Sequence, residues 1–348
     1  MSSSKIPLTS SDVDLDIESI EDWSNGLLEI NNSQQIIRSL NSTARSPIAN
    51  WTSETPVLIQ GISTPLGRYA ASQMKAHRTR VVAGVSVGQG GRVFEEIPIC
   101  NLVEEAIAQV GSIEISLIFV EPYAVLDAAL EAIAAGIRQL ILCTQNVPPL
   151  DAIRLSQRAK ETNTLILGSG SAGAIVPEKL LLGTCEPQFF TPGSVGLIGR
   201  SEILTSEVAL ELSQAQIGQS IAVNLGTDDI LGSTFQQWLR LLESDADTEA
   251  ILLIEHSLSG TQSAAAEYIA AEIEKPIVAY IAGLKIPVLE TPIYPASAIA
   301  SYCTQPIPHT DTAEQKVKAF KKAKIPVAKH LSQIPNLVKK ALKKSGKG

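Results

Sequence analysis

The stretch Pro56-Val57-Leu58-Ile59-Gln60-Gly61-Ile62-Ser63-Thr64-Pro65-Leu66-Gly67 decides the fold. Its first residues form an apolar run that predicts a short strand, Gly61 predicts a turn, and the residues from Gly67 to His77 have a helical pattern. A second apolar strand, Arg80 to Val85, follows that helix. Strand, helix and strand in succession are the unit of parallel α/β sheets, so this segment predicts a βαβ fold.

The alternation continues on both sides of a Gly- and Pro-rich crossing. Before the crossing, further strands are expected near 117–120, 139–142 and 164–167, and after it near 195–198, 221–224, 250–254 and 276–281. Helices of about ten residues lie between them, which favours two doubly wound domains with sheets covered on both faces. The expected boundaries are an extension over 1–53, a first domain over 54–175, a linker over 176–194 and a second domain over 195–345.

Composition limits the class of protein. The chain has 348 residues, 45% of them hydrophobic, which is enough for two domain-sized cores. Its cysteines form no CxxC pair and no Cys/His cluster, so buried free thiols in a reducing compartment are favoured over disulfides or metal ligands. The absence of an apolar run of about 18 residues and the polar, acidic N-terminus predict a cytoplasmic protein without a membrane span. Neither a metal nor a nucleic-acid partner is expected.

The two ends of the chain differ in charge. Residues 1–53 are acidic and rich in Ser and Asn, which predicts a largely disordered extension with one short helix near 17–28. From Glu314 onward, lysines greatly outnumber acids, although the whole chain carries a net charge of −8. This basic end fits an anion-binding patch or a solvated helix face. An apolar stripe that includes Ile334, Val338 and Leu342 favours the solvated face.

Four loops of the first domain follow strand ends, where parallel sheets bind ligands: Gly61–Gly67, Gly88–Gly91, Cys143–Asn146 and Gly168–Gly173. The first loop alone is a weak dinucleotide signal, because it is not GxGxxG and no acidic residue ends the second strand.

The order of these loops resembles the CoA-binding domain of succinyl-CoA synthetase alpha subunits, whose loops read GxTGSxG, GxxPGKGG, ThrGluGlyIlePro and GlyProAsnCysProGly. Leu130 to Ile137 also matches a helix of that family, and the resemblance covers about residues 55–345. It implies a Rossmann-like CoA-binding domain followed by a flavodoxin-like doubly wound ligase domain. It also implies coenzyme A as the ligand, and a beta-like subunit or a second copy of the chain as the partner.

The resemblance places a degenerate coenzyme A site on Ser63, Thr64, Pro65, Leu66, Gln89, Cys143, Thr144 and Gln145. Thr64 stands where the family has glycine, and Pro65 offers no backbone N–H. Gln89 replaces the lysine of the second loop and removes a cation aimed at phosphate. We therefore expect weak binding of coenzyme A, if any. The glycines that remain in these loops fit tight turns equally well.

The segment Lys275 to Gly283 resembles the strand that leads into the family's phosphohistidine loop, which ends in GlyHisAlaGly. Residues 284–299 contain no histidine, and the nucleophile's position falls on Tyr294 or Pro295. His256, in a neighbouring loop, is a weak candidate for a displaced nucleophile, and a hydrogen-bonded loop histidine is the favoured reading.

The segment Gly199 to Glu207 falls on the family's SerArgSerGlyThrLeuThrTyrGlu, which opens a helix facing the phosphohistidine. Glu202 replaces a glycine of the phosphate cradle. A carboxylate about 4 Å from a phosphate is repelled by roughly 4 kcal/mol at an effective dielectric constant near 20. Alternatively, Glu202 caps the helix dipole. Glu207 matches the glutamate that steadies the family's histidine.

Two hypotheses follow. The favoured one is a catalytically inactive alpha-like subunit that acts as a scaffold, a regulatory subunit or a weak coenzyme A or nucleotide binder, because the nucleophile is missing. The alternative is an active succinate–CoA ligase alpha subunit whose nucleophile is relocated or supplied by a partner.

Overall fold

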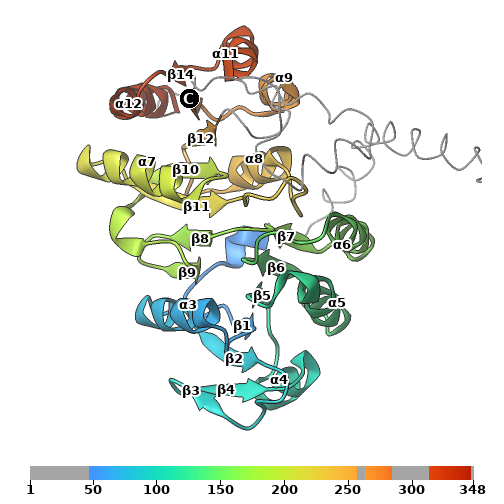
Figure 1. Cartoon of the computed structure of the whole chain (residues 1–348). Helices are drawn as coiled ribbons and strands as arrows, with labels where there is room; N and C mark the ends of the chain where they lie inside the picture. Colours follow the sequence, from blue (N-terminus) through green and yellow to red (C-terminus); the bar gives the residue numbers. More distant parts are fainter. Residues whose placement is uncertain (1–46, 257–262, 284–312, 346–348) are drawn as a thin grey trace, which may run out of the picture. The chain divides into compact units, whose positions relative to one another are not determined.

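The computed structural model describes residues 47–256, 263–283 and 313–345, which form two seven-stranded sheets (Figure 1). The expected extension lies almost wholly outside these residues, and so do Tyr294 and Pro295. The prediction of two parallel-rich α/β sheets is confirmed.

The first sheet has the strand order β3-β4-β2-β1-β5-β6-β7 and is parallel except at its β3 edge. The strands are β1 (Val57–Gln60), β2 (Val81–Val85), β3 (Val93–Phe94), β4 (Ile97–Cys100), β5 (Ile115–Ile118), β6 (Gln139–Leu142) and β7 (Leu165–Leu167). Helices α4 (Val103–Val110), α5 (Val125–Ala134) and α6 (Pro149–Thr162) pack on one face, and α3 (Pro65–Ala76) packs on the other. Strand order reverses between β1 and β5, which places a ligand-binding switch point beside the loop that follows β1.

One strand of this sheet begins earlier than the sequence predicts. The expected strand at 117–120 is β5, Ile115–Ile118, shifted by two residues. Ser116 interrupts the apolar pattern, but it is fully buried because its hydroxyl donates to Gln60 Oε1 at 2.8 Å. The edge strands β3 and β4 were not predicted. Each is short, and Pro98 lies inside β4.

The second sheet has the order β14-β13-β12-β10-β11-β8-β9. Its parallel strands are β10 (Pro192–Gly199), β11 (Gln219–Asn224), β12 (Ala250–His256), β13 (Ile277–Ala282) and β14 (Val327–Ala328). Helices α7 (Glu202–Gln214) and α12 (Ile334–Ser345) pack together, and α9 (Ser263–Glu272) packs against both α8 (Phe235–Ser244) and α11 (Ala313–Lys322). The order β11-β10-β12-β13-β14 is the flavodoxin-like arrangement, with its switch point between β10 and β12.

The segment expected to be a linker, 176–194, belongs to the second sheet instead. It contains β9 (Leu180–Gly183) and the start of β10, and β8 (Gly173–Val176) pairs antiparallel with both β9 and β11. Glycine and proline interrupt the apolar pattern in this segment, so the sequence did not predict the hairpin. Gly173 has φ +97°, and a Cβ there would lie 1.7 Å from Leu182 O, so the close pairing requires glycine.

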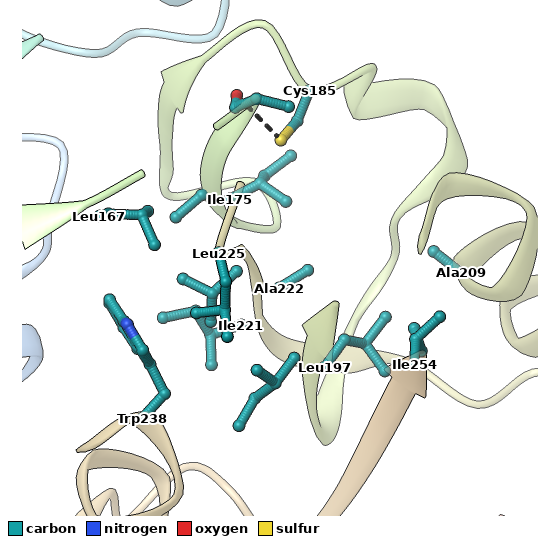
Figure 2. Packing of buried hydrophobic residues seen from close by; sticks show 14 of the residues in the cluster. Leu167, Ile175, Cys185, Leu197, Ala209, Ile221, Ala222, Leu225, Trp238 and Ile254 are labelled. Carbon is teal, nitrogen blue, oxygen red and sulfur yellow. Dashed lines mark hydrogen bonds between the residues drawn. The ribbon is translucent and has the colours of Figure 1, made fainter. Parts of the chain in front are cut away.

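A single hydrophobic cluster joins the two sheets. It runs from Leu167 of the first sheet to Ile175 and Ile221 of the second (Figure 2). Trp238 of α8 lies with its ring centroid 6.1 Å from that of Trp51, which precedes β1. Because apolar burial contributes about 25 cal/mol per Å², this shared core fixes the two sheets against each other.

A buried threonine also links the sheets. Thr79, just before β2, donates its hydroxyl to Leu181 O at 2.8 Å and accepts from Leu181 N at 3.1 Å. Leu181 lies on β9, the edge strand of the second sheet. The Thr79 side chain therefore bonds to both the N–H and the C=O of Leu181 at this edge.

We predict that Thr79→Val lowers the free energy of unfolding by about 1–3 kcal/mol, because the nearly isosteric change leaves the backbone groups of Leu181 buried without partners. Chemical denaturation followed by circular dichroism measures the change. Thr52→Val, at an exposed threonine of the same region, is the matched control. Equal stability of the two variants would contradict this role of Thr79.

Candidate functional site

The turn after β1 uses its own polar groups to start α3. Thr64 is the N-cap: its hydroxyl oxygen accepts from Gly67 N at 3.0 Å, and the hydroxyl donates to Gly61 O at 2.9 Å. Pro65 occupies the first helical turn and has no N–H. Two of the donors that a helix N-terminus normally offers to an anion are therefore absent or already used.

The remaining groups of this turn still point to a ligand. The hydroxyl of Ser63 is buried and has no hydrogen-bond partner among the described residues. Leu66 is 48% exposed at the same helix end. The turn therefore combines an unsatisfied hydroxyl with an exposed apolar side chain.

The glycines of the turn have structural reasons of their own. Gly61 has φ +80°, and a Cβ there would lie 2.8 Å from the Phe119 carbonyl carbon. A Cβ on Gly67 would lie 2.3 Å from Gly61 O. The close packing of α3 on the sheet requires both residues, so they are not by themselves a mark of ligand binding.

The loop after β2 is held from within. The N–H groups of Gly88 and Gly90 donate to Asn101 Oδ1 at 2.9 and 3.0 Å. Gln89 accepts from Arg92 Nη1 at 3.4 Å and offers no positive charge. Two backbone donors of this loop are therefore occupied by a side-chain amide of the same chain.

Cys143, at the end of β6, is a buried core residue. Complete burial raises its pKa well above the ordinary value for a thiol. Burial likewise raises the pKa of Cys185 to about 12, and the Cys185 thiol donates to Ala172 O at 3.4 Å (Figure 2). Both side chains therefore stay neutral thiols and neither is activated as a nucleophile.

The loop after β6 is bound by a residue that we did not single out from the sequence. The Asp228 carboxylate accepts from Asn146 N and Val147 N, each at 3.1 Å, and from Ser169 Oγ at 2.8 Å. Thr144 turns inward and donates its hydroxyl to Val120 O at 2.6 Å. A signal did exist in the sequence, since Gly226–Gly232 resembles the GlyGlyAspProIleProGly turn of succinyl-CoA synthetase alpha subunits.

The polar residues thus fall into separate groups. Gln145 lies near Gly170 and Asp228. A Cβ placed on Gly170 would lie 3.1 Å from Gln145 Cγ and 3.3 Å from Asp228 Oδ1. Tyr69 of α3 donates to Glu186 Oε1 at 3.4 Å. Its pKa is raised by burial first, then by the charges of Glu186 and Glu202.

At the start of α7, Ser201 is the N-cap, and Glu202 is an acidic residue of the first turn, where a carboxylate can interact with the helix dipole. The Ser201 hydroxyl oxygen accepts from Leu204 N at 3.4 Å, while Glu202 is the first helical residue. Partial burial raises the pKa of Glu202, and the charge of Glu186 adds to the increase. Burial therefore disfavours the ionised form of this carboxyl group.

Glu202 borders a small cavity beneath α7. The cavity has a volume of about 10 Å³ and is shared with Thr205 of α7 and Asn224 of β11. Asn224 is buried and its Nδ2 has no partner among the described residues. A space of this size holds about one water molecule.

The carboxyl ends of the second sheet hold buried charges. Arg200 donates to Gly226 O at 3.1 Å and to Asp228 O at 2.6 Å. Glu255, at the end of β12, lies 3.6 Å from Lys316 Nζ of α11, and both side chains are buried. Burial lowers the pKa of Arg200, and the charge of Glu255 opposes that shift.

The remaining candidates do not form a catalytic group within the part of the chain that is described. Glu207 is an exposed residue of α7, and its charge helps to raise the pKa of Tyr280, after burial. His256 ends β12 opposite Ala282, and only its backbone is described. Across the described ranges, no cluster of three His, Cys, Asp or Glu side chains is placed to hold a metal ion. No described helix is long and apolar enough to cross a membrane.

Comparisons with known proteins agree with this architecture. Residues 52–146 match the family model of the CoA binding domain. A solved structure of ATP citrate lyase from Methanothrix soehngenii, in complex with citrate and coenzyme A, superposes with a TM-score of 0.73 at 17% identity. The matched region covers 86% of this chain and 51% of the ATP citrate lyase chain. That likeness supports the fold.

Curated relatives identify the family. The succinate–CoA ligase (ADP-forming) subunit alpha 2 of Archaeoglobus fulgidus is 34% identical over 288 residues, which are 83% of this chain and 97% of the relative. The malate–CoA ligase subunit alpha of Methylorubrum extorquens is 37% identical over 239 residues, covering 67% of this chain and 80% of the relative. The chain therefore belongs to the family of succinate–CoA ligase alpha subunits and contains its CoA-binding domain.

Proposed function

We propose that the protein is a catalytically inactive alpha-like subunit, which binds coenzyme A weakly and acts as a scaffold or regulatory subunit. The observation that carries this proposal is the occupied N-terminus of α7. Glu202 places a partly buried carboxyl group in the first turn of this helix. An anionic intermediate at this helix end would meet a like charge.

The weak binding of coenzyme A rests on donors that are already engaged. Asp228 takes two N–H groups after β6, Asn101 takes two after β2, and Thr64 takes one at the start of α3. A ligand phosphate would have to displace these contacts, most of which are made by charged or amide oxygens. Ser63 Oγ is the group that favours residual binding.

The proposed partner is a beta-like subunit. On α7, Ile203 is 76% exposed and Leu210 is 36% exposed. Apolar side chains displayed on a helix that starts at the switch point suit burial against a second subunit. A homodimer through the same helix is the other arrangement that these residues would suit.

The alternative function is an active ligase whose nucleophile is His256. Its support is the position of His256 at the end of β12, directly after the buried Glu255. Lys316 already neutralises that carboxylate at 3.6 Å, which makes this alternative the weaker one.

We predict that the protein forms no acid-labile phosphoprotein when it is incubated with labelled ATP and a beta subunit of the family. The reason is that residues 284–299 contain no histidine and α7 begins with a carboxylate. An active alpha subunit with the same beta subunit is the positive control. Stoichiometric label that disappears in His256→Ala would establish the alternative function.

A second prediction concerns Glu202. Because its pKa is raised in the folded state, the folded protein disfavours the ionised carboxylate, and the resulting loss of stability is present above the raised pKa. Glu202→Gln should therefore raise the melting temperature at neutral pH by roughly 1–3 °C. The gain should shrink as the pH falls through the raised pKa toward the ordinary glutamate value.

Glu207→Gln removes the same charge from an exposed position of the same helix and is the matched control. Melting curves over a pH series measure both variants. If Glu202→Gln is less stable than wild type at neutral pH, its carboxylate stabilises the helix dipole instead, and the argument from desolvation fails.

A further inference from the structure

We propose that the edge of the second sheet at β14 is a docking site for an acidic polypeptide segment of a partner protein. This edge is flanked by α11 and α12, which lie on either side of β14 (Figure 1). Together, these elements and their connections expose nine lysines: Lys318, Lys321, Lys322, Lys324, Lys329, Lys339, Lys340, Lys343 and Lys344. The proposal is separate from the proposed function, since it involves neither the CoA-binding loops nor α7.

The lysines are presented by a rigid scaffold. The apolar sides of the helices are buried in the domain, through Phe320 on α11 and through Ile334 and Val338 on α12. The polar sides must therefore face solvent. These lysines are thus exposed, as expected for a solvated helix face, and they gather many positive charges on the two helices and their connections.

The charges are not neutralised by the described part of the chain. None of these nine lysines forms an ion pair with an acid of the described residues, and the one acid between 313 and 345 is Glu314. Lys316 differs, because it is buried against Glu255. An uncompensated surface of one sign attracts partners of opposite charge and accelerates their association.

The residue types favour an acidic polypeptide over the other polyanions. Residues 313–345 contain no arginine, and their one Phe, Tyr or Trp residue, Phe320, is buried, so stacking on nucleic-acid bases is not provided. The apolar side of α12 is already packed, so it is not available to enter a bilayer. An extended acidic chain can also follow lysines around both sides of a sheet edge, whereas a flat bilayer meets one side.

The test uses the full chain and a fluorescein-labelled polyglutamate peptide, with binding followed by fluorescence anisotropy. Wild type should bind, and the affinity should fall as salt is added, because the contact is electrostatic. Changing Lys339, Lys340, Lys343 and Lys344 to Gln should weaken binding about tenfold, and so should changing Lys318, Lys321, Lys322 and Lys324 to Gln.

The matched control removes the same positive charge elsewhere, with Arg92, Arg154, Lys160 and Lys179 changed to Gln, all of them exposed. Its affinity should stay within about twofold of wild type. Equal losses in the control would reduce the effect to net charge and overturn the site. A loss in one helix variant alone would overturn the two-sided arrangement. Tighter binding of duplex DNA or of phosphatidylserine vesicles at equal salt would assign the surface to another class of partner.

Discussion

The hydrogen bonds of the Asp228 carboxylate hold together the part of the molecule where a ligand would bind. Asp228 follows β11 in the second sheet, yet it accepts from two backbone N–H groups that follow β6 in the first sheet, and from Ser169. Hydrogen bonds to an ionised acceptor are about twice as strong as neutral ones. One side chain therefore fixes three loops and occupies donors that an anionic ligand would require.

The same residue connects these loops to the second switch point. Its carbonyl accepts from Arg200, which lies just before α7, and the charge of Glu255 opposes the lowering of the Arg200 pKa by burial. Glu255 is paired with Lys316. Burying a charge costs free energy unless the charge is paired. Removing one partner of a buried ion pair therefore destabilises a protein by more than the intact pair stabilises it. Such a network favours a fixed arrangement of these residues at the carboxyl ends of the second sheet.

The repeating strand and helix pattern of the sequence was enough to predict both sheets, because buried parallel strands are continuous apolar runs. The pattern failed where polar or small residues are buried. Ser116 is buried with its hydroxyl bonded to Gln60 of β1, and the β8–β9 hairpin begins and ends with glycine. The loops at the strand ends were predicted as ligand-binding candidates from the sequence, and that assignment stays a prediction. Asp228 and Asn224 were missed, because their roles depend on loops that are distant in sequence.

Calorimetric titration of coenzyme A into the full chain tests the central claim most directly, namely that the chain's own side chains have replaced the ligand contacts. The account predicts a dissociation constant weaker than micromolar. It also predicts that Gln89→Lys improves the affinity little, because Asn101 already holds the N–H groups on either side of Gln89. A micromolar or tighter constant for wild type would contradict the account and show that the internal contacts yield to coenzyme A.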